Sequence, residues 1–412
     1  MPLTWADLAA RTLARQFPAS VASAGSETAV SASSETAVSG SGAAGQQRPG
    51  PDAADVVRVV GAVGPIQAQT ARSPFLGLAA RLPGVTHEQV SAAYEQLGVV
   101  RGSNLRGTVH TSTGPDHAVL DAATRLGQRA LWARTLRLAD ARMEEVWSAI
   151  EAYAADTWRT PAELADHLRA WIAEHDPDAT PRLDNSAGRY FAFGHGGLIR
   201  RPLTGPWSGQ GSPGYHTATT LLGPDDTSRR AVLLADADAA TDALVRRHLT
   251  AYGPSSRQDI AWFSGLGLRL VDAALDRAAN ELTAHEGPDG RTYWDLPGGP
   301  APIELPGVRL LPEFDALLCG FDPPARERFV DAAHYRILWQ QENGLLLAPL
   351  LLDGRLSGHW RLAGTGRRRI LEVAYFAGTR KPRVAELAAP VAALRAVMDL
   401  DVTAVSVRKH AP

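Results

Sequence analysis

The chain has 412 residues, 45% of them hydrophobic and 21% charged, a composition typical of a globular protein of roughly three domains. A formal net charge of -2 gives no overall basic field for nucleic acid, so any such surface must be local. The single cysteine, Cys319, excludes an internal disulfide and a cysteine-based zinc site, and we expect no metal or other cofactor. With no apolar run near the roughly twenty residues of a membrane span and no signal peptide, we expect a cytoplasmic protein without membrane contact.

The first element is an amphipathic helix from Thr4 to Phe17, which Thr4 caps. From residue 19 to 52 the composition falls to Ser, Ala, Gly, Thr and Glu, and the hexapeptide Ser-Glu-Thr-Ala-Val-Ser at 26–31 returns at 34–39. A stretch with so little to bury cannot offset its ordering entropy. We therefore predict a flexible insertion at 19–52.

A valine-rich helix at 53–63 leads into a connection that carries two amides, Gln67 and Gln69, before Ser73-Pro74 starts the next helix. In an extended or turning backbone, side chains at i and i+2 project to the same side. Both carboxamides then converge on one small target, such as a water molecule, without a charged base. The alternative is that they are polar residues at a helix end, facing solvent.

A capping box, Thr86 with Gln89, opens another helix, and the alternating stretch 105–111 then predicts a strand. Arg106 and His110 fall on one face of that strand. His110 is a candidate ligand-contacting group, and the alternative is a histidine hydrogen-bonded at the edge of a core.

Two later stretches share one order of elements: helix, turn, helix, then a two-stranded hairpin. The first has a capped helix from Thr160, a helix near 187–193 and strands at 198–203 and 215–222. The second has helices at 242–252, from Ser256, and at 270–279, with strands near 282–284 and 292–294. This order is that of a winged helix, a fold that often binds DNA but serves in protein contacts as well.

The last third predicts strands at 337–340, 345–352 and 356–361, with a tight turn at Asp353-Gly354. Its hairpin carries Arg355, His359, Trp360 and Arg361, which suit phosphate and base contact, although a solvated hairpin face is equally consistent. The three arginines at 367–369 are candidates for contact with backbone phosphates, and the alternative is a solvated surface.

Five motifs, in this order along the chain, resemble the AlkZ-like winged-helix DNA glycosylases of the azinomycin-resistance type. They are Ile66-Gln67-Ala68-Gln69 with Arg72-Ser73-Pro74, the stretch 105–110, the stretch 250–255 leading to Asp259 and Trp262, the stretch 311–315, and the hairpin 353–361. The resemblance implies tandem winged helices and a catalytic pair at Gln67 and Gln69. A glutamine at 69 implies the self-resistance branch, whose members excise bulky lesions. The insertion at 19–52 departs from the family pattern.

These observations predict an α+β fold with four parts: residues 1–150 with the catalytic motif, winged helices at 151–235 and 236–300, and a hairpin-rich part at 301–412. The predicted partner is double-stranded DNA carrying an alkylated purine, bound by a monomer. A purine alkylated at N7 is a cationic leaving group, so its glycosidic bond breaks without a strong acid. The predicted DNA-binding residues are Arg72, Arg106, His110, Arg355, His359, Trp360 and Arg361. A transcription regulator or a non-catalytic lesion-binding protein is the alternative.

Overall fold

The computed structural model describes residues 2–18, 50–179, 186–340 and 345–411. The predicted insertion therefore lies outside the described residues, except for its last three. Of these, Asp52 caps the helix α3 (Ala53–Val63) through its side chain. Within the described ranges, no helix is long and apolar enough to cross a membrane.

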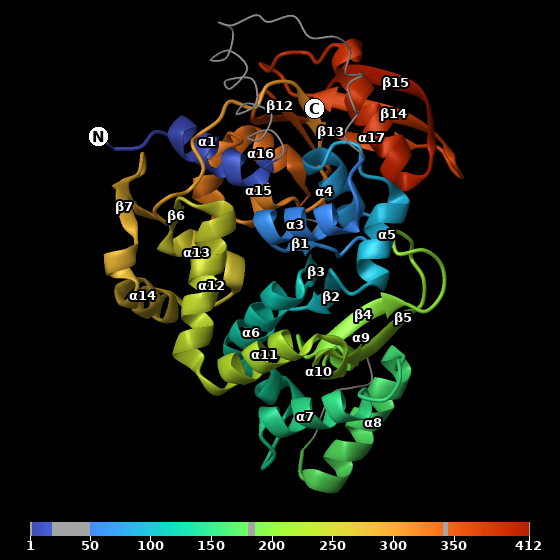
Figure 1. Cartoon of the computed structure of the whole chain (residues 1–412), viewed down its shortest axis with the longest axis vertical. Coiled ribbons are helices and arrows are strands. Elements are labelled where there is room, and N and C mark those ends of the chain that lie inside the picture. The colour runs from blue at the N-terminus through green and yellow to red at the C-terminus, as the bar shows by residue number, and fades with distance from the viewer. Residues whose placement is uncertain (1, 19–49, 180–185, 341–344, 412) are drawn as a thin grey trace, which may run out of the picture.

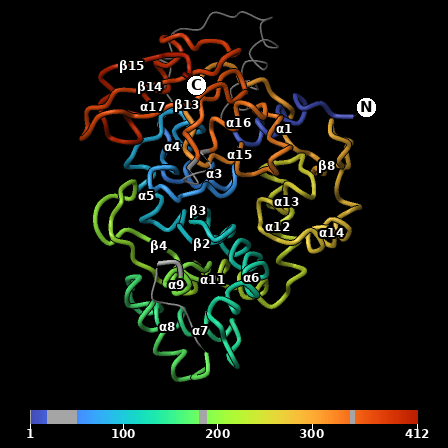
Figure 2. Tube along the Cα trace, turned by 180° about the vertical axis from the view of Figure 1, so that it is seen from behind, coloured from blue at the N-terminus to red at the C-terminus, as the bar shows by residue number. Residues whose placement is uncertain are grey.

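A five-stranded antiparallel sheet lies at the middle of the molecule (Figure 1), between the C-terminal sheet and helices α7 and α8. Figure 2 shows the same arrangement from behind. Its strand order is β1-β3-β2-β4-β5, so β1 is an edge strand. The strands are β1 (Ile66–Gln67), β2 (Val100–Ser103), β3 (Val109–Ser112), β4 (Leu198–Pro202) and β5 (Pro213–Thr217).

The predicted strand at 105–111 is wrong over its first half. Residues Leu105–Gly107 form a short 3-10 turn, η1, in which Arg106 has a φ of 53°. The strand β3 begins only at Val109. The left-handed backbone at Arg106 carries the chain from β2 to β3.

The N-terminal helices follow the predicted capping signals. Capping boxes at Thr4, Thr86 and Thr160 open α1 (Trp5–Gln16), α5 (His87–Glu95) and α8 (Pro161–His175). The other helices of this half are α4 (Ser73–Arg81), α6 (Gly114–Leu136), α7 (Met143–Tyr153), α9 (Ser186–Tyr190), α10 (Ala218–Leu221) and α11 (Pro224–Ala235).

The predicted boundary between residues 150 and 151 does not separate two sheets. Strand β4 pairs with β2, with Arg101 opposite Arg200, so the hairpin β4–β5 extends the sheet that carries Gln67. The strand predicted at 215–222 ends at Thr217, and α10 follows. This hairpin is therefore part of a larger sheet, and the winged-helix assignment of residues 151–235 stays a prediction.

Residues 236–300 have the predicted order of elements. Three helices, α12 (Ala237–Tyr252), α13 (Arg257–Ser264) and α14 (Leu268–Arg277), precede the hairpin β7 (Thr283–Glu286) and β8 (Thr292–Asp295). The turn η2 (Ala279–Glu281) joins α14 to β7, and β6 (Ser255–Ser256) completes a three-stranded sheet, β6-β8-β7. The winged-helix assignment itself stays a prediction.

The C-terminal part is built on a second five-stranded sheet, β15-β14-β13-β12-β9, in which β14 and β15 are parallel. The hairpin predicted at Asp353-Gly354 is confirmed, since both residues have positive φ and join β12 to β13. The predicted strand at 337–340 is shorter, because helix α16 runs to Leu338. The elements are β9 (Val308–Leu310), α15 (Ala316–Cys319), η3 (Pro323–Arg328), α16 (Ala332–Leu338), β10 (Trp339–Gln340), β11 (Leu345–Leu346), β12 (Pro349–Leu352), β13 (Arg355–Ala363), β14 (Arg368–Tyr375), η5 (Val384–Leu387), α17 (Ala388–Met398) and β15 (Asp401–Lys409).

Candidate active site

Gln67 lies opposite His110 in the ladder between β1 and β3. Side chains opposite one another in a ladder share one face of the sheet, and both residues border one small cavity of about 10 Å³. Holding one water molecule takes on the order of 10–15 Å³. We call this space the glutamine cavity; it is lined by Pro65, Gln67, Arg106, His110, Tyr252, Phe263, Phe314, Ala316, Cys319 and Gly320.

The chain reaches this cavity through Gly64, which both its backbone conformation and its contact with Tyr252 require to be glycine. Gly64 ends α3 with a φ of 88°, and a Cβ there would lie 2.7 Å from the Tyr252 hydroxyl oxygen. That hydroxyl donates to the carbonyl oxygen of Pro65 at 3.4 Å. Tyr252 thus fixes the entry to β1 from helix α12, far away in the sequence.

His110 is a neutral imidazole in this site. It is only 2% exposed, and burial, reinforced by the charge of Arg106, lowers the pKa of His110 to about 3. Its Nδ1 lies 3.1 Å from the Thr108 carbonyl oxygen, which can only accept, so Nδ1 carries the proton. Nε2 is then an acceptor, and it has no hydrogen-bond partner among the described residues.

Arg106 joins the cavity because of its left-handed backbone and not because it shares a strand face with His110. Its guanidinium donates to the carbonyl oxygen of Phe263 on α13. Burial lowers the pKa of Arg106, although it stays a cation. Sequence reasoning missed Phe263 and assigned no role to Tyr252, although Tyr252 lies within a motif, 250–255, that carries the family resemblance.

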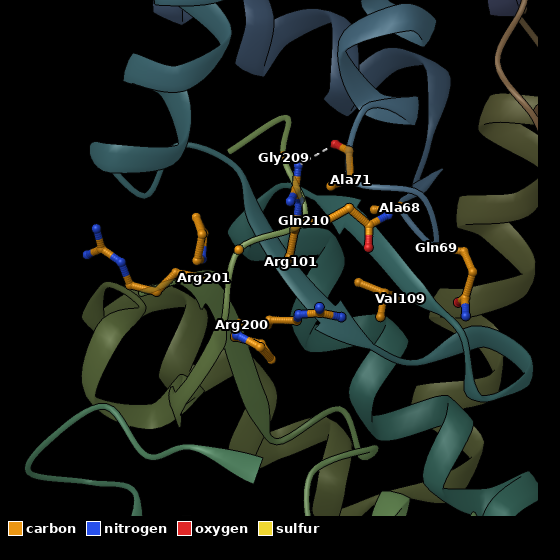
Figure 3. Close-up of a pocket in the computed structure, with 12 residues that line it drawn as sticks. Ala68, Gln69, Ala71, Arg101, Val109, Arg200, Arg201, Gly209 and Gln210 are labelled. Atoms are coloured by element: carbon orange, nitrogen blue, oxygen red, sulfur yellow. Dashed lines mark hydrogen bonds between the residues drawn. The ribbon is translucent and has the colours of Figure 1, made fainter. Parts of the chain in front are cut away.

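Gln69 faces a different space. Strand β1 ends at Gln67, and the exposed Gln69 lines a second cavity of about 50 Å³ with Arg101, Arg200 and Arg201 (Figure 3). Ala68 and Val109 also line it, and because side chains alternate along strands, it lies on the other face of the β1–β3 ribbon. The two amides therefore do not converge on one cavity. We call the second space the arginine pocket.

The remaining predicted site residues line neither cavity. Arg72 is exposed and pairs with Glu313. Trp360 is 4% exposed and donates from its indole nitrogen to the Leu311 carbonyl oxygen at 2.8 Å, so it packs in the core of the C-terminal sheet and presents no free face to a base.

The other hairpin residues are more accessible. Arg355 and Arg361 are exposed, and Arg361 pairs with Glu372 at 2.6 Å. His359 is half-buried, and its Nε2 lies 3.0 Å from Nδ1 of His410. Burial lowers the pKa of His359 to about 4, with His410 adding to the shift, so it holds no positive charge at neutral pH.

A family model described as DNA glycosylase AlkZ-like matches residues 60–397, which contain both cavities. The chain belongs to the AlkZ-like DNA glycosylase family. It is thus a DNA glycosylase, as the motifs around Gln67 and the hairpin implied. A comparison with curated proteins finds no match.

A similar solved structure is the Streptomyces sahachiroi DNA glycosylase AlkZ. It matches with a TM-score of 0.72 at 20% sequence identity, over 98% of this chain and 99% of that one. At this identity the likeness shows the fold, a mixed α/β arrangement shared along the whole chain. The family assignment of residues 60–397 fixes the type of enzyme.

Proposed function

We propose that this glycosylase hydrolyses the N-glycosidic bond of bulky N7-alkylated purines in double-stranded DNA, as self-resistance to a DNA-alkylating natural product. The observation that carries the proposal is the glutamine cavity, which has the volume of one water and is bordered by a neutral amide and a neutral imidazole. None of the residues that line it has a carboxylate.

Gln67 and His110 supply two acceptors for the O–H groups of one water. The amide oxygen of Gln67 is one, and the unprotonated Nε2 of His110 is the other. A water held by both O–H groups has its oxygen lone pair free to attack the sugar. Positioning of this kind replaces a bimolecular encounter by a unimolecular step.

The reaction balances without a strong base. The water oxygen bonds to C1′ of the sugar while the bond from C1′ to the purine nitrogen breaks, and its electron pair neutralises the cationic base. The attacking water becomes acidic only as the new bond forms, and its proton then passes to His110 or to solvent. A histidine with a pKa of about 3 can accept a hydrogen bond throughout but is too weak a base to activate water beforehand.

The absence of a carboxylate from the residues lining the cavity favours a substrate whose leaving group is already activated. A carboxylate would hold the water roughly twice as strongly and would stabilise the sugar cation. Unmodified purines need that help, whereas N7-alkylated purines need less. The second amide, Gln69, is exposed beyond the strand end, and we assign it to contact with the DNA strand instead of the water.

The test is release of the modified base from a duplex carrying one bulky N7-alkylated guanine, followed under single turnover by strand cleavage at the abasic site. We expect release by the wild-type protein and none from an unmodified duplex. Binding of the lesion without release would show a lesion-binding protein and would refute the proposal. A duplex carrying the smaller N7-methylguanine, tested in parallel, shows how strongly the rate of base release depends on the size of the alkyl group.

A further inference from the structure

Two arginines lie side by side on one face of the central sheet. Arg101 on β2 and Arg200 on β4 are register partners, so their side chains leave the same face of neighbouring strands. Figure 3 shows both at the arginine pocket, with Arg201 on one side and Gln69 on the other. Like charges directly opposite one another destabilise a sheet. The arrangement therefore calls for a compensating negative charge.

The described residues supply little of that charge. Arg101 is buried and donates to the Ala71 carbonyl oxygen at 3.0 Å and to the Tyr94 hydroxyl at 3.2 Å, and neither acceptor is a carboxylate. Its guanidinium carbon lies 4.7 Å from the centre of the Tyr94 ring. These contacts hold Arg101 in place and leave its charge uncompensated.

The side chain of Arg200 has fewer partners than that of Arg101. Arg200 is half-buried, its backbone pairs in the sheet, and across residues 2–18, 50–179, 186–340 and 345–411 its side chain makes no hydrogen bond or ion pair. Glu95, which pairs with the pocket residue Arg201 at 3.3 Å, also accepts from the indole nitrogen of Trp207 at 2.7 Å and so is already engaged. A half-buried guanidinium with five free donors is a site for an acceptor from outside the chain.

The size of the pocket limits what this acceptor can be. Its volume of about 50 Å³ exceeds the 10–15 Å³ or so that one water requires. It holds a few waters, and a phosphate group can take their place. Its polar lining combines guanidinium groups with the amides of Gln69 and Gln210, all of which can donate to oxygen.

We propose that the arginine pocket binds a phosphodiester group of the DNA strand, with Arg200 as its principal contact and Gln69 at its rim. This proposal rests on the proposed function only in taking DNA as the ligand. Because β1 is the edge strand of the sheet, a DNA strand that crosses this edge reaches both cavities. The phosphate contact then sets the position of the strand, and the glutamine cavity meets the sugar.

The first test is binding of a short undamaged duplex over a series of salt concentrations, measured by fluorescence anisotropy. Each lost phosphate contact removes about 0.9 from the log–log salt slope. We expect Arg200→Gln to lower the slope by about that amount and to weaken binding about tenfold, or about 1.4 kcal/mol. The matched control is Arg229→Gln, an exposed arginine on α11 that lines neither cavity, and it should leave the slope unchanged.

The second test uses inorganic phosphate alone and needs no DNA. Phosphate should raise the melting temperature of the wild-type protein more than chloride of equal ionic strength does. Arg200→Gln should reduce the difference to the general stabilisation that phosphate gives any folded protein. Equal effects of phosphate on both proteins, or an unchanged salt slope for Arg200→Gln, would overturn the proposal. Neither measurement involves base release, so failure of the glycosylase proposal for N7-alkylated purines would show separately.

Discussion

Gln67 and His110 stand opposite each other on β1 and β3 and border the same cavity of about 10 Å³. The register of two short strands thus places an amide and a neutral imidazole around the volume of one water. We propose that this pairing, and not the neighbouring amide at Gln69, holds the nucleophile.

We expect Gln67→Ala to lower the single-turnover rate of base release by at least about tenfold, the effect of losing about 1.4 kcal/mol of transition-state stabilisation. Binding of undamaged DNA should be unchanged, because Gln67 lines the water-sized cavity and not the arginine pocket. The control is Gln96→Ala, an exposed glutamine at the end of α5. A Gln67→Ala protein with full activity would end the catalytic assignment.

Gln69→Ala should behave differently from Gln67→Ala. We expect it, too, to slow base release by about tenfold, but because Gln69 lies at the rim of the arginine pocket, weaker DNA binding should account for part of the loss. Rates measured at rising protein concentration separate the two effects. If saturating protein restores no activity to Gln69→Ala, Gln69 acts in the chemical step as well.

The state of His110 predicts the pH dependence of the reaction. Burial and Arg106 lower the pKa of His110 to about 3, so the imidazole stays neutral at pH values where an ordinary histidine gains a proton. The single-turnover rate should therefore show no histidine step between about pH 5 and pH 8. A rate that falls with a midpoint near pH 6.5 would mean that His110, or another histidine, must be neutral and titrates normally. The pH profile of His110→Ala, measured in parallel, shows whether the titrating histidine is His110.

The same shift has a consequence for stability. The unfolded chain binds a proton at His110 below about pH 6.5, whereas the folded protein does so only near pH 3. Stability must then decline as the pH falls between these values.

Local signals in the sequence predicted the starts of several helices, because an N-cap residue and the side chain that bonds back to it are three residues apart. The helices α6, α7, α11 and α17 were not predicted. The capping boxes at Thr86 and Thr160 form as predicted, Thr4 and Ser256 start their helices as predicted, and these two form capping boxes as well. The turn at Asp353-Gly354 is equally local, and the hairpin around it is correct.

The parts that sequence reasoning could not reach depend on contacts between distant segments. No sequence signal near Arg200 predicts that β4 pairs with β2 and places Arg200 beside Arg101. The alternation at 105–111 suggested a strand, but a left-handed residue at Arg106 interrupts it, and no feature of an arginine side chain signals that backbone. Gln67 and Gln69 were predicted to converge, and they do not, because β1 ends between them.

A buried charge network joins helices α6, α7 and α11, with Glu151 as the α7 member, and should contribute strongly to stability. Asp121 is fully buried and accepts from Nε of Arg125 at 2.7 Å and from Nε of Arg230 at 2.7 Å. Asp121→Asn leaves two buried guanidiniums short of charge and should cost about 3–5 kcal/mol in urea unfolding. Asp156→Asn, which removes an exposed acid paired with Arg159, should cost less than about 1 kcal/mol.

The network also predicts how that cost varies with pH. Burial alone would raise the pKa of Asp121, but Arg125 and Arg230 outweigh it and hold the pKa well below its ordinary value. A lowered pKa means that the stabilisation is present above the unfolded value, near pH 4, and is lost as the pH falls below it. The difference between wild type and Asp121→Asn should therefore shrink from about pH 4 downward. A stability difference that does not change with pH would mean that the charge of Asp121 does not contribute to the stability of the folded protein.

The β12–β13 hairpin permits a last comparison with the arginine pocket. Arg355 is exposed, and among the residues that the structure describes its side chain makes two contacts of 3.5 Å to backbone carbonyl oxygens, so it can turn to a phosphate at little cost. Arg361 must first leave Glu372, whose released charge repels the phosphate. If the hairpin lies against DNA, changing Arg355 and Arg361 to alanine together should lower the salt slope by about 0.9, the contribution of one contact and not of two.

Salt-dependent anisotropy on an undamaged duplex measures this, with Arg229→Ala as the control. A slope that falls for Arg200→Gln but not for the double hairpin variant would place the DNA on the central sheet alone, with the hairpin facing solvent. A loss for both would mean that the duplex spans the central sheet and the C-terminal sheet together.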